Sequence, residues 1–131
     1  MSRHNISVIK IQEGIYSFLA EGLDIAVEDR IDLNAKKPYI AMADLNLRGQ
    51  SARGLEGFSI TQELLVFSNF PGKDETIEII DKIRELVKDY EVEIKNANIH
   101  TQEIDDDITI SQFDVAVYEG QLFLNITVFN H

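Results

Sequence analysis

The chain has 131 residues, a formal net charge of −11, 44% apolar residues and no cysteine. This length predicts one domain over residues 1–131, and the apolar content is too high for a disordered chain. The lack of cysteine excludes disulfides and a cysteine nucleophile, and no apolar run approaches the ~20 residues that span a bilayer.

The first predicted element is a helix over residues 6–21. Apolar residues recur there at spacings of three and four, which is typical of one apolar stripe on a helix. Asn5 or Ser7 can cap its start, and Gly22 stands where a left-handed residue often ends a helix. The charges in this N-terminal segment do not fit a signal peptide, so we expect a soluble protein made inside the cell. A brief strand is possible within residues 24–34.

A strand with cleanly alternating apolar residues is predicted to begin after Pro38. Five residues are expected to share one of its faces: Tyr39, Ala41, Ala43, Leu45 and Leu47. Residues 48–57 hold three of the seven glycines, which predicts a flexible loop. The strand pattern resumes over residues 58–68, so the two strands and the loop predict a β-hairpin with a long loop.

The second predicted helix covers residues 74–90 and has a broad apolar stripe. Asp74 is a good residue to cap its start, and Glu75 suits the positive end of the helix dipole. Glu78 and Lys82 have the i,i+4 spacing and the order that favour an ion pair.

The remainder of the chain returns to strand patterns. Strands are predicted over residues 94–104, 108–118 and 121–129, with a turn at 105–107 and a tight turn at Glu119 and Gly120. Strands are grouped apart from helices in this order of elements. The sequence therefore predicts an α+β fold, with a mainly antiparallel sheet packed against two amphipathic helices.

The sequence contains no recognisable catalytic or metal-binding motif. His4, His100 and His131 lie far apart without metal-ligand spacing, and no phosphate-binding glycine loop or nucleophile elbow is present. Ser68 follows an apolar strand but has no histidine placed beside it, so we interpret it as a hydroxyl at a strand end. We expect no enzyme activity, no cofactor and no bound metal.

One acidic cluster could in principle bind Mg²⁺ or Ca²⁺. It contains Glu103, Asp105, Asp106 and Asp107. The glycine and the final glutamate of a calcium-binding hand are missing, so a solvated turn is favoured over a metal site.

The glycine-rich segment is the best candidate for an interaction surface, because long loops in small domains often carry function. Arg48, Gln50 and Arg53 lie within it, and Leu55 and Phe58 add apolar side chains at its base, as an interface anchor or as part of the core. Arg48 and Arg53 could hold an acidic partner there, or the segment could be a mobile loop that faces solvent.

The charge bears on possible partners. The 12 basic residues are scattered among 23 acidic ones, whereas a DNA-binding surface needs clustered Lys and Arg. Specific DNA binding and membrane association are therefore not expected. An acidic surface that DNA passes without binding is compatible with this charge, as is an acidic surface that only maintains solubility.

From residue 38 to 78 the sequence resembles the tail-completion, or tail-terminator, proteins of long-tailed bacteriophages. The first strand opens with Pro38-Tyr39-Ile40 and continues to the small-acidic pair Ala43-Asp44; the second ends in Leu64-Leu65-Val66-Phe67-Ser68. Gly72-Lys73-Asp74-Glu75 then leads into an amphipathic helix that runs to Tyr90. An N-terminal helix and a C-terminal pair of strands complete the same order of elements.

The resemblance implies a structural virion protein without catalytic activity. It implies a ring, usually of six subunits, at the head-proximal end of the tail tube, which ends tube polymerisation and offers a surface for the head connector. Its partners would be further copies of itself, the tail-tube protein and the head connector or stopper, with DNA passing through. In that setting we predict that Arg48 and Arg53 help to join neighbouring subunits or the tail tube. Three alternatives stay open: another head–tail connector such as a stopper or adaptor, an acidic metal-binding or enzymatic domain, and a generic acidic interaction domain.

Overall fold

The computed structural model describes residues 6–130, apart from the side chain of Ala52. Its elements follow in the order α1 (Val8–Gly22), β1 (Ala26–Glu28), β2 (Tyr39–Ala52), β3 (Leu55–Ser68), α2 (Asp74–Asp89), β4 (Ala97–Ile104), β5 (Thr109–Asp114) and β6 (Val117–Asn130). The strands form one sheet in the order β1-β2-β3-β6-β4, and β5 also pairs with β6.

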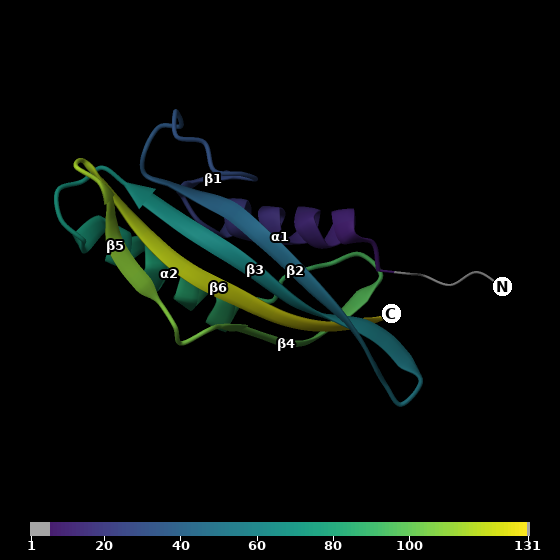
Figure 1. The fold of residues 1–131 in the computed structure, drawn as a ribbon. Helices are drawn as coiled ribbons and strands as arrows, with labels where there is room; N and C mark the ends of the chain where they lie inside the picture. Colours follow the sequence, from purple (N-terminus) through teal and green to yellow (C-terminus); the bar gives the residue numbers. More distant parts are fainter. Residues whose placement is uncertain (1–5, 131) are drawn as a thin grey trace.

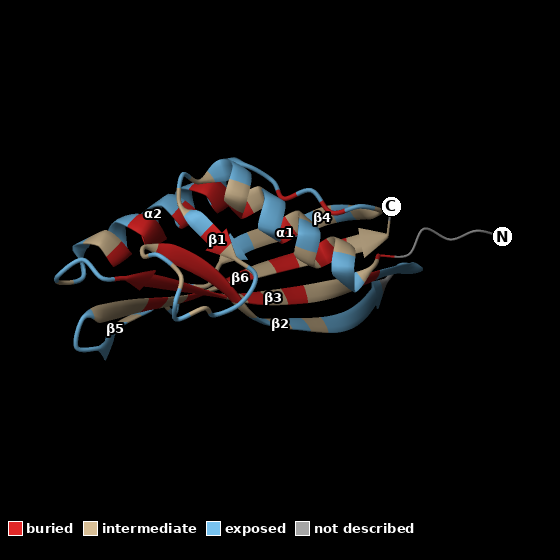
Figure 2. Ribbon diagram, turned by 90° about the horizontal axis from the view of Figure 1, so that it is seen from above, coloured by how far each residue is buried: buried red, intermediate tan, exposed pale blue. Residues whose placement is uncertain are grey.

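Both helices cover the same face of this sheet, as Figure 1 and Figure 2 show. All strand pairs are antiparallel except β1 with β2. The expected α+β fold, with a mainly antiparallel sheet and two amphipathic helices, is therefore confirmed. The opposite face, which no helix of the described residues covers, is called the helix-free face below.

The main core lies between the helices and the sheet. The helices contribute Ile11, Ile15, Leu19, Ile79, Ile80, Ile83, Leu86 and Val87 to it. The sheet contributes every second residue of β6, from Leu122 to Val128, and the corresponding residues of β2 and β3. The two predicted helical stripes are therefore the surfaces that fold onto the sheet.

The ends of the helices differ in detail from the prediction. Ser7 caps α1 as expected, because its Oγ accepts a hydrogen bond from the Lys10 N–H at 3.4 Å. Gly22, however, is the last helical residue and is not left-handed; among the described glycines only Gly54 and Gly72 have a positive φ. A Cβ at Gly22 would overlap the side chain of Leu86, so this glycine allows the two helices to approach closely.

The start of α2 also lies one residue away from the prediction. Lys73 occupies the cap position without a side-chain cap bond, and Asp74 is the first helical residue. Glu75 accepts a hydrogen bond from the buried Ser68 hydroxyl at 2.6 Å, which ties the end of β3 to this helix. Lys82 pairs with Asp24, at 3.7 Å, and not with Glu78.

The predicted long loop at residues 48–57 is wrong. β2 and β3 stay paired as far as Ala52 and Leu55, and only Arg53 and Gly54 form the turn. Both turn residues have positive φ, 53° and 79°, and two such residues reverse the chain of a hairpin in the shortest distance. The segment contains two further glycines, Gly49 and Gly57. Gly57 is required, because a Cβ there would overlap the carbonyl oxygen of Val128 on β6.

The prediction that five residues of the first long strand share one face is also wrong. Tyr39 and Ala41 lie on the helix-free face, whereas Leu45 and Leu47 pack against the main core. The register shifts between Met42 and Leu45, and this β-bulge reverses the alternation.

The bulge is held by the side chain of Gln62, which is almost fully buried. Its Nε2 lies 3.4 Å from the carbonyl oxygen of Ala43 and 3.3 Å from that of Asp44. The two carbonyls in the bulge therefore find a donor inside the core, where an unpaired carbonyl would be unfavourable.

The C-terminal hairpin exists, but its turn is at Val115 and Ala116 and not at Glu119 and Gly120. Gly120 lies inside β6 and is buried. A Cβ at this position would lie 2.8 Å from the Cγ2 of Thr76 and 2.8 Å from the Cδ1 of Ile80. Glycine is therefore present because α2 crosses β6 closely at this point, and not because the chain turns.

Candidate assembly surface

The helix-free face carries an aromatic cluster at the end of the sheet near β1. Tyr39 stacks on Phe67 with ring centroids 5.2 Å apart, and Phe113 meets Phe67 edge-on at 5.7 Å. The Tyr39 hydroxyl accepts a hydrogen bond from the Asp32 N–H at 3.3 Å, and burial raises the pKa of this tyrosine. In a sheet with only one buried face, the opposite face is usually polar, whereas this cluster makes part of the helix-free face apolar.

The middle of the helix-free face is polar, and its side chains bond to one another. Gln121 Nε2 donates to Glu63 Oε2 at 2.6 Å, and the Thr61 hydroxyl donates to Asn125 Oδ1 at 3.1 Å. Because these groups bond across β3 and β6, they stiffen the sheet and leave it hydrophilic. Such a face can be exposed to water or lie beside another macromolecule without forming an apolar contact with it.

Glu119 stands on the same face and is electrostatically disfavoured in its charged form. Partial burial raises its pKa, and the nearby charge of Glu63 raises it further. The folded state therefore binds more protons than the unfolded chain just above the ordinary pKa of glutamate. In this window the free energy of unfolding decreases as the pH rises.

We expect Glu119→Gln to raise the melting temperature at about pH 7 and to change it less at about pH 4, where the carboxyl group is largely protonated. The physical reason is that glutamine removes the charge whose burial and repulsion by Glu63 oppose folding. Thermal unfolding followed by circular dichroism at the two pH values measures the effect. An equal shift at both values would contradict the assigned cause.

The five residues predicted for an interface lie on the hairpin of β2 and β3, which projects past the end of β6 in Figure 1. Arg48, Gln50 and Leu55 belong to its helix-free side, and Arg53 is in the turn. Arg48, Gln50 and Arg53 are exposed, and Leu55 is 50% exposed. Phe58 is separate from them, because it points to the other side and packs against the margin of the core.

Within residues 6–130, no group of three or more His, Asp or Glu side chains is arranged to hold a metal ion. Asp105 uses one carboxylate oxygen to accept the Asp107 N–H at 3.0 Å, as in an Asx turn. His100 is exposed and its ring meets Phe129 edge-on, whereas His4 and His131 lie outside the described residues. No helix of the described part is long and apolar enough to cross a membrane.

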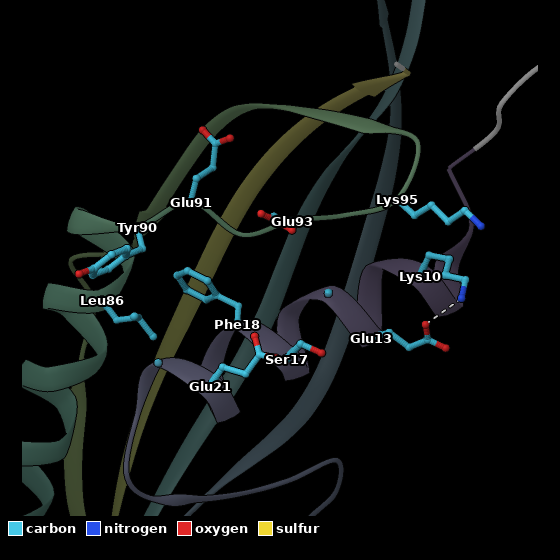
Figure 3. A pocket seen from close by; sticks show the side chains of 12 residues that line it. Lys10, Glu13, Ser17, Phe18, Glu21, Leu86, Tyr90, Glu91, Glu93 and Lys95 are labelled. Atoms are coloured by element: carbon cyan, nitrogen blue, oxygen red, sulfur yellow. Dashed lines mark hydrogen bonds and ion pairs between the residues drawn. The ribbon is translucent and has the colours of Figure 1, made fainter.

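A groove of about 790 Å³ runs between α1 and the end of α2, as Figure 3 shows. Phe18, Leu86 and Tyr90 form its apolar part, and Lys10 pairs with Glu13 at 3.0 Å at its other end. No histidine is among its lining residues.

No known protein family and no curated protein matches the sequence. The fold, however, is similar to that of a chain in a solved structure described as the virion of a native gene transfer agent particle, with a TM-score of 0.76. The similarity covers 92% of this chain and 95% of that chain, at 11% sequence identity. The two chains therefore share a fold over nearly their whole lengths.

Proposed function

We propose that this protein is a structural component of a phage-like virion, and that it forms the tail-terminator ring at the head-proximal end of the tail. The observation that carries the proposal is the fold that it shares, over nearly its whole length, with a chain of a gene transfer agent virion. The assignment as a tail terminator is supported by the order of elements, which resembles that of the terminator family.

The surfaces of the molecule support an assembly role. The β2–β3 hairpin projects from the body with two exposed arginines, and a chain with a net charge of −11 offers many acidic partners for them. The polar, internally bonded middle of the helix-free face suits a surface beside a channel, because its described residues form no basic cluster that would retain DNA.

In this role the protein acts by contact and not by catalysis. Copies joined head to tail close into a ring, for which six subunits are the expectation. One side of the ring covers the last tail-tube subunits and prevents further addition. The other side provides the surface on which the head connector docks, and the genome passes through without specific binding.

Deletion of this gene in the parent particle tests the proposal. We expect tails of abnormal and variable length that fail to join heads, because nothing stops polymerisation of the tube. Negative-stain electron microscopy measures the length distribution, and a plasmid copy of the gene should restore the normal length.

Three outcomes would overturn the terminator assignment. Tails of normal length without heads would indicate a stopper or adaptor of the head. Absent tails would indicate a part of the tube itself. Unchanged, infectious or transfer-competent particles would contradict a structural role in the virion.

A further inference from the structure

Two edges of the sheet lack a strand neighbour over a long stretch. β1 pairs with β2 only at Tyr39, Ile40 and Ala41, so over residues 42–52 β2 has only β3 beside it within the described chain. At the other side of the sheet, β4 pairs only with β6, so within the described chain no strand pairs with its outer edge. Long free edges present rows of unpaired N–H and C=O groups that favour pairing with another strand.

The strand registers place these two edges at the same level of the sheet. Two rows of opposed residues cross it from edge to edge: Leu45–Gln62–Leu124–Ile104 and Gln50–Gly57–Phe129–Asn98. The free part of β2, residues 42–52, is therefore level with β4 and is long enough to pair with the whole of Ala97–Ile104. The part of β2 that β1 covers is level with β5 instead.

The chain directions are also compatible. Three successive antiparallel pairings separate β2 from β4, so the two strands run in opposite directions. A second copy rotated about an axis along the strands would therefore bring its β2 edge antiparallel to the β4 edge of the first copy. Antiparallel pairing is the more stable arrangement for each residue.

We propose that copies of this protein assemble by antiparallel pairing of the β2 edge of one copy with the β4 edge of the next. The inference rests on the proposed ring and names the contact that closes it. The occupant of each edge is a second copy because level and direction match between two edges of one and the same sheet, and the free part of β2 is long enough to cover β4. A contact between two different edges is heterologous, and such a contact closes into a ring when the rotation between successive copies divides a full turn.

The side chains at the two edges are complementary. On the helix side, Leu45 and Leu47 of β2 and Ile99 and Ile104 of β4 are half-buried at the margins of the core, so pairing would cover both margins. On the helix-free face, Arg48 is exposed on β2 and Glu103 is exposed on β4. Arg48 is level with Thr101, two residues from Glu103, so the opposite charges would lie within reach.

A charge exchange tests the side-chain part of the contact. We expect Arg48→Glu and Glu103→Arg each to weaken self-association by about tenfold or more, because like charges then face each other, and we expect the double variant to restore it. Lys73→Glu makes the same charge change at the exposed start of α2, away from both edges, and should leave assembly unchanged. Size-exclusion chromatography with light scattering over a range of protein concentrations measures association, and circular dichroism checks that each variant is folded.

Cysteine cross-linking tests the backbone pairing directly, since the natural chain has no cysteine. We expect a Gln50→Cys and Asn98→Cys double variant to form intermolecular disulfides, in solution or in purified particles, that appear as a ladder ending at one ring size, because these two residues are level and share the helix-free face. Gln50→Cys combined with Lys73→Cys, at the exposed start of α2 away from β4, is the control and should form none. Equal cross-linking of both pairs, or no cross-link in solution and in particles, would overturn the edge pairing.

The two proposals fail separately. Specific cross-links together with tails of normal length after gene deletion would retain the edge pairing and remove the terminator role. Overlong tails after deletion, without cross-links in complemented particles, would retain the terminator role and remove the edge pairing.

Discussion

Gly120→Val is expected to lower the free energy of unfolding by about 3 kcal/mol, a large part of the stability of an ordinary domain. Gly120 is buried within β6, where Thr76 and Ile80 of α2 pack over it. Even a single Cβ there would come within 2.8 Å of both side chains, and valine adds two further methyl groups. Helix α2 must then move away from the sheet or the strand must shift.

The same substitution at Gly49 is the matched control. Gly49 is also a strand glycine of this sheet, but no atom lies within 4 Å of a Cβ placed on it. Gly49→Val should therefore change stability little, because valine suits a strand and meets no obstacle. Urea unfolding of the two variants measures both effects, and equal losses would contradict the close packing of α2 on β6.

Gln102→Leu is expected to cost about 2–3 kcal/mol, because a single side chain serves three backbone groups. The Gln102 Nε2 donates to the Val87 carbonyl at 2.9 Å and to the Tyr90 carbonyl at 2.6 Å, and Oε1 accepts from the Val92 N–H at 2.8 Å. These groups belong to the C-terminal end of α2 and the segment after it, where a helix leaves its last carbonyls unpaired. Leucine has a similar volume but leaves them without this partner.

Gln112→Leu provides the comparison, since Gln112 is an exposed glutamine of β5 with one hydrogen bond, to the Val115 carbonyl at 3.2 Å. Its replacement should have a much smaller effect on urea unfolding. In Gln102→Leu the amide of Val92 should also exchange its hydrogen faster with solvent, which nuclear magnetic resonance measures. Unchanged exchange at Val92 would contradict the capping role of Gln102.

The candidate surface illustrates how far residue patterns reach. Glycine content and charge singled out the hairpin as a candidate surface, and its polar residues are exposed, but the segment is paired strand and not loop. Phe58 was grouped with them, but it lies on the opposite side because neighbouring residues of a strand alternate. The aromatic cluster was missed because Tyr39, Phe67 and Phe113 come from three strands that only the folded sheet brings together.

The free edges could not have been predicted either, because an edge is a property of strand order. Nothing in residues 97–104 distinguishes a strand with two neighbours from one with a single neighbour. The polar composition of that segment suggested partial exposure, and the position of β4 at the end of the sheet explains it.

The sequence by itself determined the class of fold, the number of helices and the main long strands. These features follow from the spacing of apolar residues along the chain, which is a local property and is the same whatever core the element packs against. Only the tertiary structure decided which face each residue of β2 takes, where two turns lie and which glycines are required. Those features depend on contacts between remote segments: the Gln62 amide on the carbonyls of the β2 bulge, and α2 against Gly120. Such contacts have energies comparable to local preferences, and they leave no periodic trace along the chain.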